Sequence, residues 1–292
     1  MSKVWLVTGS SRGFGREITR TALADGDRVV ATARRPEQLD DLVQEYGDHI
    51  RPFALDVTDA EAARAAVRFA VDEFGALDVV VNNAGYAISR PIEEMTEEEF
   101  RGQIDANLYG VVNVTRAALP VLRGQRSGHF VQFSSIGGRV GGSPGLSAYQ
   151  TAKWAVEGFS EVLNSEVKPF GIKVTIIEPG GFRTDWGGAS MPSVEVGAEY
   201  DGTVGAMNRY RESTVHTWPG DPVRGARIIV DTVRLAEPPL RLLLGAAAVT
   251  SALDAAEIRS AEARQWAEVS AAADFPGAAQ APMAAATGQP TE

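Results

Sequence analysis

Tyr149 and Lys153 lie four residues apart in the stretch Ala-Tyr-Gln-Thr-Ala-Lys, a spacing that places two side chains on one face of a helix. A phenol has a pKa near 10 and is a poor proton donor or acceptor at neutral pH. An ammonium group beside it stabilises the phenolate and lowers that pKa, by roughly one to three units for a close pair. The pair could therefore transfer protons. Because Tyr-x-x-x-Lys is common by chance, the interpretation depends on what the surrounding elements place beside it.

A glycine-rich turn lies near the N-terminus. Residues 3–8 form a short apolar run, Gly9, Gly13 and Gly15 follow it, and a helical pattern begins at once. A strand, glycine turn and helix in this order aim backbone N–H groups at an anion, and glycine allows a pyrophosphate to approach closely. The spacing differs from the commoner Gly-x-Gly-x-x-Gly fingerprint. A tight turn without a ligand is the alternative interpretation.

Polar side chains follow two other apolar runs. Residues 82–85 read Asn-Asn-Ala-Gly after the run 77–81, and Ser134 and Ser135 follow the run 130–133. The carboxyl ends of parallel strands face the ligand crevice of an open α/β sheet. These side chains are therefore candidates for a binding site, although hydrogen bonding at strand ends would also explain them.

Together these motifs resemble those of the short-chain dehydrogenase/reductase family, in its compact single-domain branch. The resemblance extends from Lys3 to around Gly245, with its motifs in the family order. It implies a nicotinamide dinucleotide as cofactor and a hydride-transfer reaction. The catalytic residues that it implies are Asn107, Ser135, Tyr149 and Lys153. The cofactor-binding residues that it implies are Gly9, Ser11, Arg12, Gly13, Phe14, Gly15, Arg34, Asp56, Val57, Asn83, Ala84, Gly85, Tyr149, Lys153, Pro179, Gly180 and Thr184.

The spacing of the implied catalytic serine departs from the family pattern. Ser135 precedes Tyr149 by fourteen residues, one more than is usual in the family. The intervening stretch 137–145 is glycine-rich and can accommodate an inserted residue. We prefer Ser135 because the pattern Ser-x-x-Gly is preserved at 135–138, and Ser134 is the alternative.

The resemblance also implies a role for each catalytic residue. Tyr149 would donate a proton to the substrate oxygen, and Ser135 would hydrogen-bond to that oxygen. Lys153 would hold the ribose hydroxyls of the nicotinamide, and Asn107 would link the lysine to a chain of water molecules. Asn107 lies within a helical pattern, where asparagine is unfavourable without a specific role.

The end of the predicted second strand indicates which dinucleotide is bound. A site selective for NAD usually holds the adenosine ribose with a carboxylate at this point, but Ala33 occupies it here and Arg34 follows. In this fold Arg12 lies close by, and two guanidinium groups suit a 2′-phosphate. The sequence therefore predicts a preference for NADP(H), although Arg34 and its neighbour Arg35 could simply be solvated. By resemblance Asp56 would accept from the adenine amino group, and helix capping is its alternative role.

Composition excludes several classes of function. The chain has 292 residues, enough for one large domain. Its formal net charge of −10 argues against nucleic acid and anionic lipid as partners. No apolar run reaches the length of a membrane span, and strand-like residues from Lys3 leave no room for a signal peptide. Without cysteine, disulfides and zinc–thiolate sites are excluded. We expect a cytoplasmic protein with no metal and no membrane association.

Short β-rich runs alternate with helical patterns, which is typical of a parallel sheet covered on both faces. Strands are predicted near 3–8, 28–33, 50–55, 77–82, 128–134, 172–178 and 240–245. The predicted fold class is α/β, a Rossmann-like doubly wound sheet of about seven parallel strands, in a single domain over residues 1–270. Residues 58–61 and 96–99 match the capping-box pattern at a helix start.

Two segments depart from this pattern. Residues 183–222 carry tryptophan, tyrosine and methionine after the sixth strand, which predicts a substrate lid. A helical excursion packed on the body of the protein is the alternative. Residues 271–292 are rich in alanine and proline and are predicted to be a disordered tail.

The sequence thus predicts an NADP(H)-dependent oxidoreductase that interconverts a carbonyl compound and an alcohol, on a bulky apolar substrate. A non-catalytic dinucleotide sensor of the same fold is the alternative, and the presence of both Tyr149 and Lys153 argues against it. A nucleotide-sugar epimerase or dehydratase is disfavoured by the glycine spacing and the short C-terminal region. The resemblance implies a homodimer or homotetramer. An apolar face could be supplied by Ala155, Phe159, Val162 and Leu163, which could instead pack on the sheet.

Overall fold

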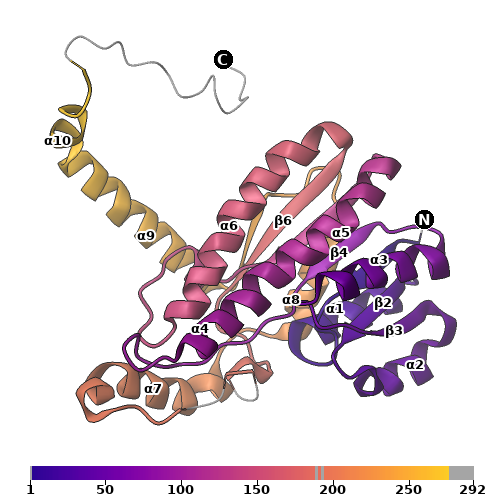
Figure 1. Ribbon diagram of the computed structural model, residues 1–292, viewed down its shortest axis with the longest axis horizontal. Helices are drawn as coiled ribbons and strands as arrows, with labels where there is room; N and C mark the ends of the chain where they lie inside the picture. The colour runs from indigo at the N-terminus through magenta and orange to yellow at the C-terminus, as the bar shows by residue number, and fades with distance from the viewer. Residues whose placement is uncertain (1, 188–189, 192–193, 276–292) are drawn as a thin grey trace. The chain divides into compact units, whose positions relative to one another are not determined.

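The computed structural model describes residues 2–187, 190–191 and 194–275. Seven parallel strands form one sheet with the order β3-β2-β1-β4-β5-β6-β7 (Figure 1). They are β1 (Val4–Val7), β2 (Arg28–Ala33), β3 (Ile50–Ala54), β4 (Val79–Asn82), β5 (Gly128–Phe133), β6 (Ile172–Pro179) and β7 (Arg241–Leu244). The predicted Rossmann-like, doubly wound α/β fold is confirmed, with each predicted strand in its expected place.

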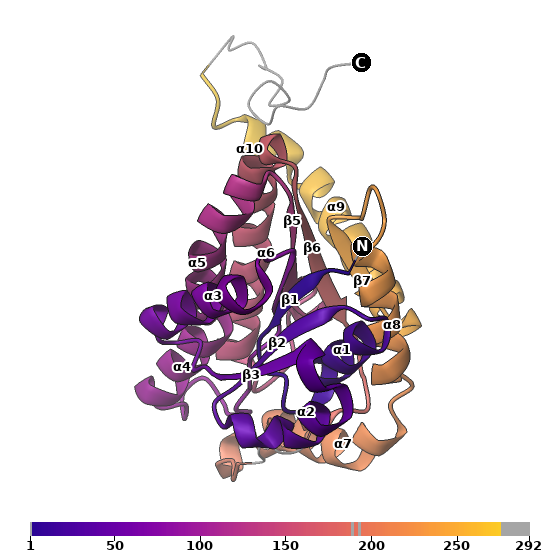
Figure 2. The same cartoon turned by 90° about the vertical axis from the view of Figure 1, so that its right-hand side faces the viewer.

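Helices cover both faces of the sheet. They are α1 (Gly13–Ala24), α2 (Asp40–Tyr46), α3 (Ala60–Phe74), α4 (Glu97–Ile104), α5 (Gly110–Gln125), α6 (Ser147–Val167), α7 (Ala206–Thr214), α8 (Pro222–Val233), α9 (Ala246–Gln265) and α10 (Ala267–Ala271). Helices α1, α2 and α8 share one core cluster, and α3, α5 and α6 share the other. Figure 2 shows the two layers, with α1 and α8 on one side of the strands and α3 and α5 on the other.

The strands read as continuous apolar runs because both faces are covered. Successive side chains of β1 point to opposite faces, so Trp5 packs in the cluster of α1 and α8 while Leu6 packs in the cluster of α3 and α5. The register pairs Val7 of β1 with Ala31 of β2 and with Val81 of β4. The carboxyl ends of these parallel strands are therefore in register, and the turns that follow them lie at the same edge of the sheet.

Local hydrogen bonds set two of the helix starts. The carboxylate of Asp59 accepts from the backbone N–H groups of Glu61 and Ala62, so Asp59 caps α3 and the predicted capping box that began at Thr58 is wrong. At α4 the predicted capping box is confirmed, with Thr96 and Glu99 exchanging hydrogen bonds.

The residues expected to form an apolar face on α6 divide between core and surface. Leu163 is buried in the cluster of α3 and α5, and Phe159 packs against the same cluster. Val162 is exposed, with 58% of its surface accessible. Packing on the sheet therefore accounts for two of them, and Val162 alone of these three faces outward.

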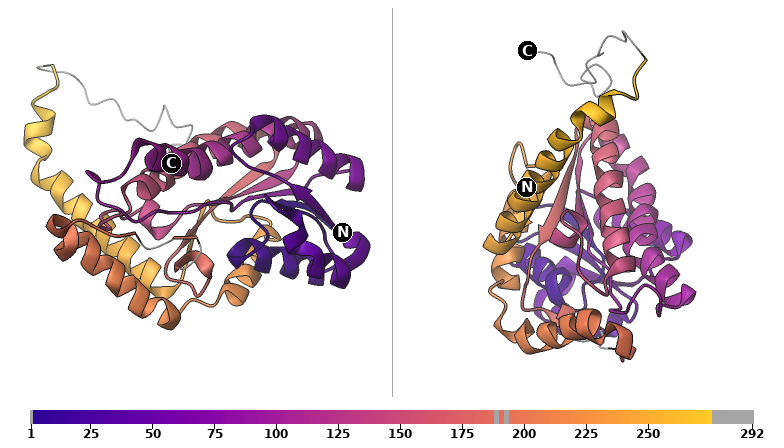
Figure 3. Two further views of the ribbon diagram at one scale, coloured as in Figure 1. Left: turned by 60° about the horizontal axis from the view of Figure 1, so that its bottom comes forward. Right: turned by 90° about the vertical axis from the view of Figure 1, so that its left-hand side faces the viewer.

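The two ends of the long connection after β6 lie side by side and are joined by backbone hydrogen bonds. Arg183 N–H donates to Gly220 O over 2.9 Å, and Gly220 N–H donates to Gly181 O over 3.1 Å. Between them lie short helical turns and α7, which is seen below the sheet in Figure 1 and, from another direction, in the left view of Figure 3. The described part of this segment is helical at residues 185–187 and 198–217, and both the lid and the helical excursion stay predictions.

The chain divides into two compact units, residues 1–252 and 253–292. The second unit contains the end of α9 and α10, which ends at Ala271. Most of the predicted disordered tail, residues 276–292, lies outside the described residues. Among the described residues no helix is both long and apolar enough to cross a membrane.

Candidate active site

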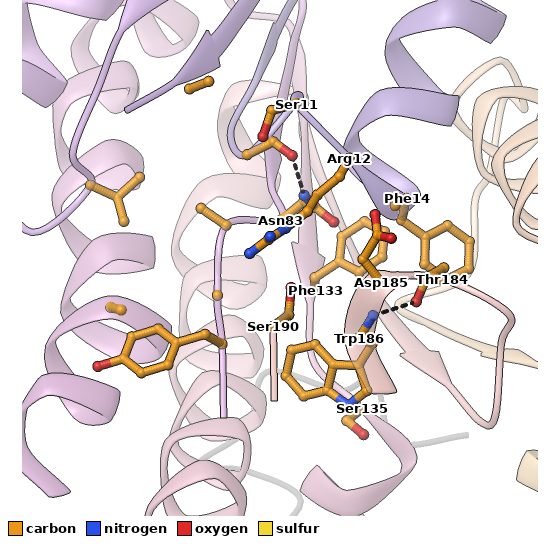
Figure 4. A pocket seen from close by; sticks show the side chains of 18 of the residues that line it. Ser11, Arg12, Phe14, Asn83, Phe133, Ser135, Thr184, Asp185, Trp186 and Ser190 are labelled. Carbon is orange, nitrogen blue, oxygen red and sulfur yellow. Dashed lines mark hydrogen bonds between the residues drawn. The ribbon is translucent and has the colours of Figure 1, made fainter. Parts of the chain in front are cut away.

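A cavity of about 850 Å³ opens at the carboxyl edge of the sheet. Figure 4 shows side chains from the turns after β1, β4, β5 and β6 around it. The residues singled out from the sequence that line it are Gly9, Ser11, Arg12, Gly13, Phe14, Arg34, Asp56, Val57, Asn83, Ala84, Gly85, Ser135, Tyr149, Lys153, Pro179, Gly180 and Thr184. Gly15 and Asn107 are absent from the lining, although both stand directly behind it. The tertiary structure therefore brings the dispersed motifs to one cavity.

The glycine turn has the conformation that an anion site needs. Gly9 and Gly13 have φ angles of +70° and +55°, which strain any residue with a side chain. A Cβ atom on Gly15 would lie 2.3 Å from Gly9 O, so Gly15 permits the close packing of α1 against the turn. No side chain of the described residues caps α1, whose N-cap residue is Arg12. The positive end of the α1 dipole thus has no anionic side-chain cap.

Asn83 braces this turn against β4. Its Nδ2 donates to Thr8 O over 2.9 Å and to Gly9 O over 3.3 Å, and its backbone N–H donates to the Thr8 hydroxyl over 2.9 Å. In Figure 4 Asn83 lies between the glycine turn and the rest of the cavity. The Asn-Asn-Ala-Gly motif therefore positions the turn as well as lining the cavity.

Three arginines line the cavity at the end of β2 and in the glycine turn. Arg12, Arg34 and Arg35 are exposed, and none makes an ion pair with a residue that the structure describes. Nearby Arg16, by contrast, pairs with Asp41. These free guanidinium groups make this end of the cavity positive, which suits a phosphate.

Asp56 lines the same end of the cavity. Its carboxylate accepts from the Thr58 backbone N–H over 3.0 Å and from the Thr58 hydroxyl over 2.7 Å. Asp56 does not cap α3, because Asp59 does. Its carboxylate is exposed beside the cavity, where an adenine amino group could donate to it.

Tyr149 lies at the other end of the cavity, in the first turn of α6. Its side chain is 7% exposed, and its ring packs on the ring of Trp186 with centroids 4.8 Å apart. Burial raises the pKa of the phenol above its ordinary value, and a hydrogen bond from Ser135 opposes that rise. The expectation of a lowered pKa is therefore wrong, because desolvation is the larger effect.

Lys153 is also buried and points to the strand beneath it. Its Nζ donates to Phe133 O over 2.7 Å and lies 5.7 Å from the centroid of the Tyr149 ring. Burial lowers the pKa of Lys153 to about 8, and the Glu157 carboxylate opposes this shift. The ammonium group thus lies near the phenol but is held by a backbone carbonyl.

Asn107 stands behind the cavity in a π-helical turn, Asp105–Tyr109, between α4 and α5. It is fully buried, and its Nδ2 donates to Tyr86 O and Gln103 O, each over 2.8 Å. Its Oδ1 has no partner among the residues that the structure describes. A Cβ atom on Gly85 would lie 2.4 Å from this oxygen and 3.8 Å from Lys153 Nζ. An unsatisfied acceptor therefore faces the same space as the lysine, with only a glycine between them.

The two serines after β5 have different surroundings. Ser135 Oγ accepts from Gly137 N–H over 3.1 Å, and Ser135 opposes the rise in the pKa of the Tyr149 phenol. Ser134 is buried, and its hydroxyl donates to Lys153 O over 3.4 Å. Both line the cavity, but the contact with the phenol favours Ser135 over the alternative.

Aromatic residues that the motifs did not identify complete the wall. Phe133, Phe182 and Tyr86 line the cavity, and the Phe14 ring lies 5.5 Å from Phe133 and 4.8 Å from Phe182. Each stands within three residues of a predicted motif residue, which is the one signal in the sequence that could have indicated them. Trp186 and Trp218, from the predicted lid segment, also line the cavity.

Comparison with known proteins gives consistent matches. A family model described as short chain dehydrogenase matches residues 3–193, which include all but one of the lining residues, Trp218. Oxidoreductase BOA17 of Botryotinia fuckeliana is 50% identical over 273 residues, covering 93% of this chain and 99% of that protein.

Two solved structures extend the comparison. A short-chain dehydrogenase from Streptomyces avermitilis has a TM-score of 0.88 and 42% identity, covering 94% of this chain and 100% of that chain. An alcohol dehydrogenase from the archaeon Thermococcus sibiricus, complexed with 5-hydroxy-NADP, has a TM-score of 0.68 and 27% identity, covering 84% and 96%. The similarity therefore includes both the sheet and the segments that form the cavity.

Proposed function

The chain belongs to the short-chain dehydrogenase family of oxidoreductases, and on this premise we propose that it is an NADP(H)-dependent enzyme interconverting a ketone or aldehyde with an alcohol. The observation that carries the proposal is that Ser135, Tyr149 and Lys153 line the same cavity as the glycine turn. An anion site and a proton donor thus face one space.

The residues at the turn fit a dinucleotide phosphate. The uncapped start of α1 and the left-handed Gly9 and Gly13 would bind the pyrophosphate. Arg12 and Arg34, which lack ion pairs with described residues, would bind a 2′-phosphate. The complex of the Thermococcus sibiricus relative with 5-hydroxy-NADP supports this choice of dinucleotide. When bound, the cofactor supplies a hydride to the carbonyl carbon or accepts one from the alcohol.

Tyr149 and Ser135 would transfer the proton and stabilise the negative charge on the substrate oxygen. Because burial raises its pKa, the phenol is protonated at neutral pH and is ready to donate when negative charge develops on the substrate oxygen. Ser135 would hydrogen-bond to the same oxygen and limit its charge. In the oxidative direction the proton would pass the other way, from the alcohol to Tyr149 in its phenolate form.

Lys153 and Asn107 would support this transfer from behind. The lysine ammonium is positioned to bind the ribose hydroxyls and to stabilise a phenolate once Tyr149 has lost its proton. The unpartnered Oδ1 of Asn107 would accept a hydrogen bond from a water molecule or from the lysine. Such a path would return a proton to Tyr149.

We propose in addition that residues 183–222 form a substrate lid and that the protein assembles as a homo-oligomer. Trp186 and Trp218 line the cavity from residues 183–222, which supports a role for this segment in covering a bulky, largely apolar substrate. The exposed Val162 on α6 is available to an interface in a homodimer or homotetramer.

The experiment that tests the function replaces Tyr149 by phenylalanine, which removes only the hydroxyl. Wild-type protein should oxidise NADPH in the presence of at least one member of a panel of ketones, followed by absorbance. Tyr149→Phe should lower kcat by about 10²- to 10⁴-fold, while NADPH still binds, as measured by calorimetry. A variant with near-normal turnover would refute the assignment of Tyr149. Cofactor binding without any turnover by the wild type would instead favour a dinucleotide sensor.

A further inference from the structure

Arg211 is a partly buried cation without a counter-charge. It lies on α7, where its Nη1 is 3.3 Å from Met191 Sδ and its Nη2 donates to Pro144 O over 3.0 Å. It makes no ion pair with any residue that the structure describes, and burial lowers its pKa. Arg209, two residues earlier on the same helix, is exposed and pairs with Asp201. The two arginines therefore differ sharply in environment.

The guanidinium group contacts Met191, and neither residue is among those that line the cavity. Met191 packs with Tyr149 and Ala87 in a small core cluster, and Trp186 packs against that cluster. One methionine side chain thus separates the charge of Arg211 from the ring of the proposed proton donor. A substrate held at Tyr149 and extending past Met191 would reach the guanidinium.

Four acidic side chains of the surrounding segments have other partners. They are Glu93 with the Tyr200 hydroxyl, Glu94 with the Gly197 N–H, Glu99 with Arg90, and Asp201 with Arg209. Asp185 lines the cavity but forms no ion pair with Arg211. The charge of Arg211 is therefore not neutralised by these neighbours.

An unsatisfied donor lies on the same face of α7 as Arg211. Asn208 precedes Arg211 by three residues, a spacing that places both side chains on one side of the helix. Asn208 is 8% exposed, and its Oδ1 accepts from the Ser89 hydroxyl over 2.6 Å. Its Nδ2 has no partner within the described part of the chain. Buried donors without acceptors are rare in folded proteins and call for an explanation such as a ligand.

We propose that Arg211, assisted by Asn208, binds a carboxylate of the substrate, so that the enzyme acts on oxo acids and the corresponding hydroxy acids. The planar guanidinium matches a carboxylate with two parallel hydrogen bonds. The substrate carbonyl would lie at Tyr149, with the carboxylate beyond Met191 and an apolar segment between the two. This inference rests on the proposed function and names the class of substrate for the same site.

The test compares oxo acids of increasing chain length with their methyl esters, using NADPH absorbance. Wild-type protein should prefer the acid at one or more chain lengths. Arg211→Met should lower kcat/KM for that acid by about 10- to 100-fold, mainly through KM, because a charged hydrogen bond is lost. Its kcat/KM for the ester should stay unchanged. Arg209→Met, on the same helix, is the matched control and should keep the preference for the acid.

Three results would overturn the inference. The wild type could reduce the keto group of the methyl esters as well as that of the acids. The Arg211→Met variant could lose activity on acids and on esters equally. The Arg209→Met variant could also lose the preference for the acid. Equal loss would mean that Arg211 only holds the loop at Pro144. If no ketone is reduced, the proposed function fails separately. Calorimetric titration of the oxo acids in the presence of NADP⁺ then tests the anion site alone. Binding that is lost in Arg211→Met would support the site, and no binding to the wild type would refute it.

Discussion

The guanidinium group of Arg139 holds the fully buried carboxylate of Glu178, with Nε 2.6 Å and Nη2 3.2 Å from its two oxygens. Arg139 follows the turn that carries Ser135, and Glu178 precedes Pro179 at the end of β6. The pair therefore ties together two segments that line the cavity. Arg241 of β7 makes a longer contact with Glu178, at 3.3 Å, and also pairs with Glu157 of α6.

We expect Arg139→Met to destabilise the protein because it leaves a buried carboxylate with one weaker partner. Removing one member of a buried pair lowers the free energy of unfolding by about 3–5 kcal/mol. Urea unfolding of the variant measures this. Arg64→Met is the control, because Arg64 and Glu61 form an exposed pair on α3, and such pairs contribute at most about 1 kcal/mol. Equal losses in the two variants would contradict the role of the buried pair.

The two serines after β5 should differ in their effect on catalysis. Ser135→Ala removes the hydroxyl that contacts Tyr149, and we expect kcat to fall by about 10²- to 10³-fold, the range found when one oxyanion donor is lost. Ser134→Ala removes a hydroxyl bonded to the backbone of α6, so kcat should change far less. NADPH affinity should be similar in both variants. If Ser134→Ala is the more damaging change, the assignment of the two serines must be reversed.

Arg34 should determine the choice between NADPH and NADH. Because its guanidinium has no ion pair with a described residue, we expect Arg34→Ala to raise KM for NADPH by about 10- to 100-fold, through loss of a charge-assisted hydrogen bond. KM for NADH should change little, since NADH lacks the 2′-phosphate. Arg64→Ala, which alters an arginine away from the cavity, is the control. An equal effect of Arg34→Ala on both cofactors would remove this residue from 2′-phosphate recognition.

His129 should make the protein sensitive to acid. The Thr175 hydroxyl donates to Pro239 O and so accepts from Nε2 of His129, which is 3% exposed on β5. Burial lowers the pKa of His129 to about 3 from 6.5, and Lys173 and Lys3 contribute. The unfolded chain binds this proton below pH 6.5 and the folded protein does not. The resulting stability is therefore complete above pH 6.5 and is lost as the pH falls toward 3.

His129→Gln removes this titration while leaving the carboxylates unchanged. Between pH 6.5 and 4.5 the wild type should lose about 2 kcal/mol more of its unfolding free energy than the variant does, because the slope approaches about 1.4 kcal/mol for each pH unit only below the unfolded pKa. Urea unfolding at the two pH values measures the difference. Parallel losses in both proteins would show that His129 titrates normally in the folded state.

Local patterns in the sequence were sufficient to predict the strands of the sheet and most of the residues that line the cavity. Apolar runs with turn residues at their ends predicted each strand, because the tendency to form a buried parallel strand depends on neighbouring residues. The turn at Gly9, the Asn83 motif and Tyr149 were then placed at one edge by the handedness of parallel strands and helices. The family membership that these residues indicated is confirmed by the comparisons.

Other properties depended on which residues meet in space. The sequence indicated a lowered pKa for Tyr149 because Lys153 is four residues away, but burial under Trp186 raises that pKa instead. The pair of Arg139 and Glu178 joins residues far apart in the chain, and no periodicity predicts it. The same holds for the unpaired Arg211. Strand and helix patterns are set by near neighbours, whereas desolvation and charge pairing are set by the path of the whole chain, which only the tertiary structure defines.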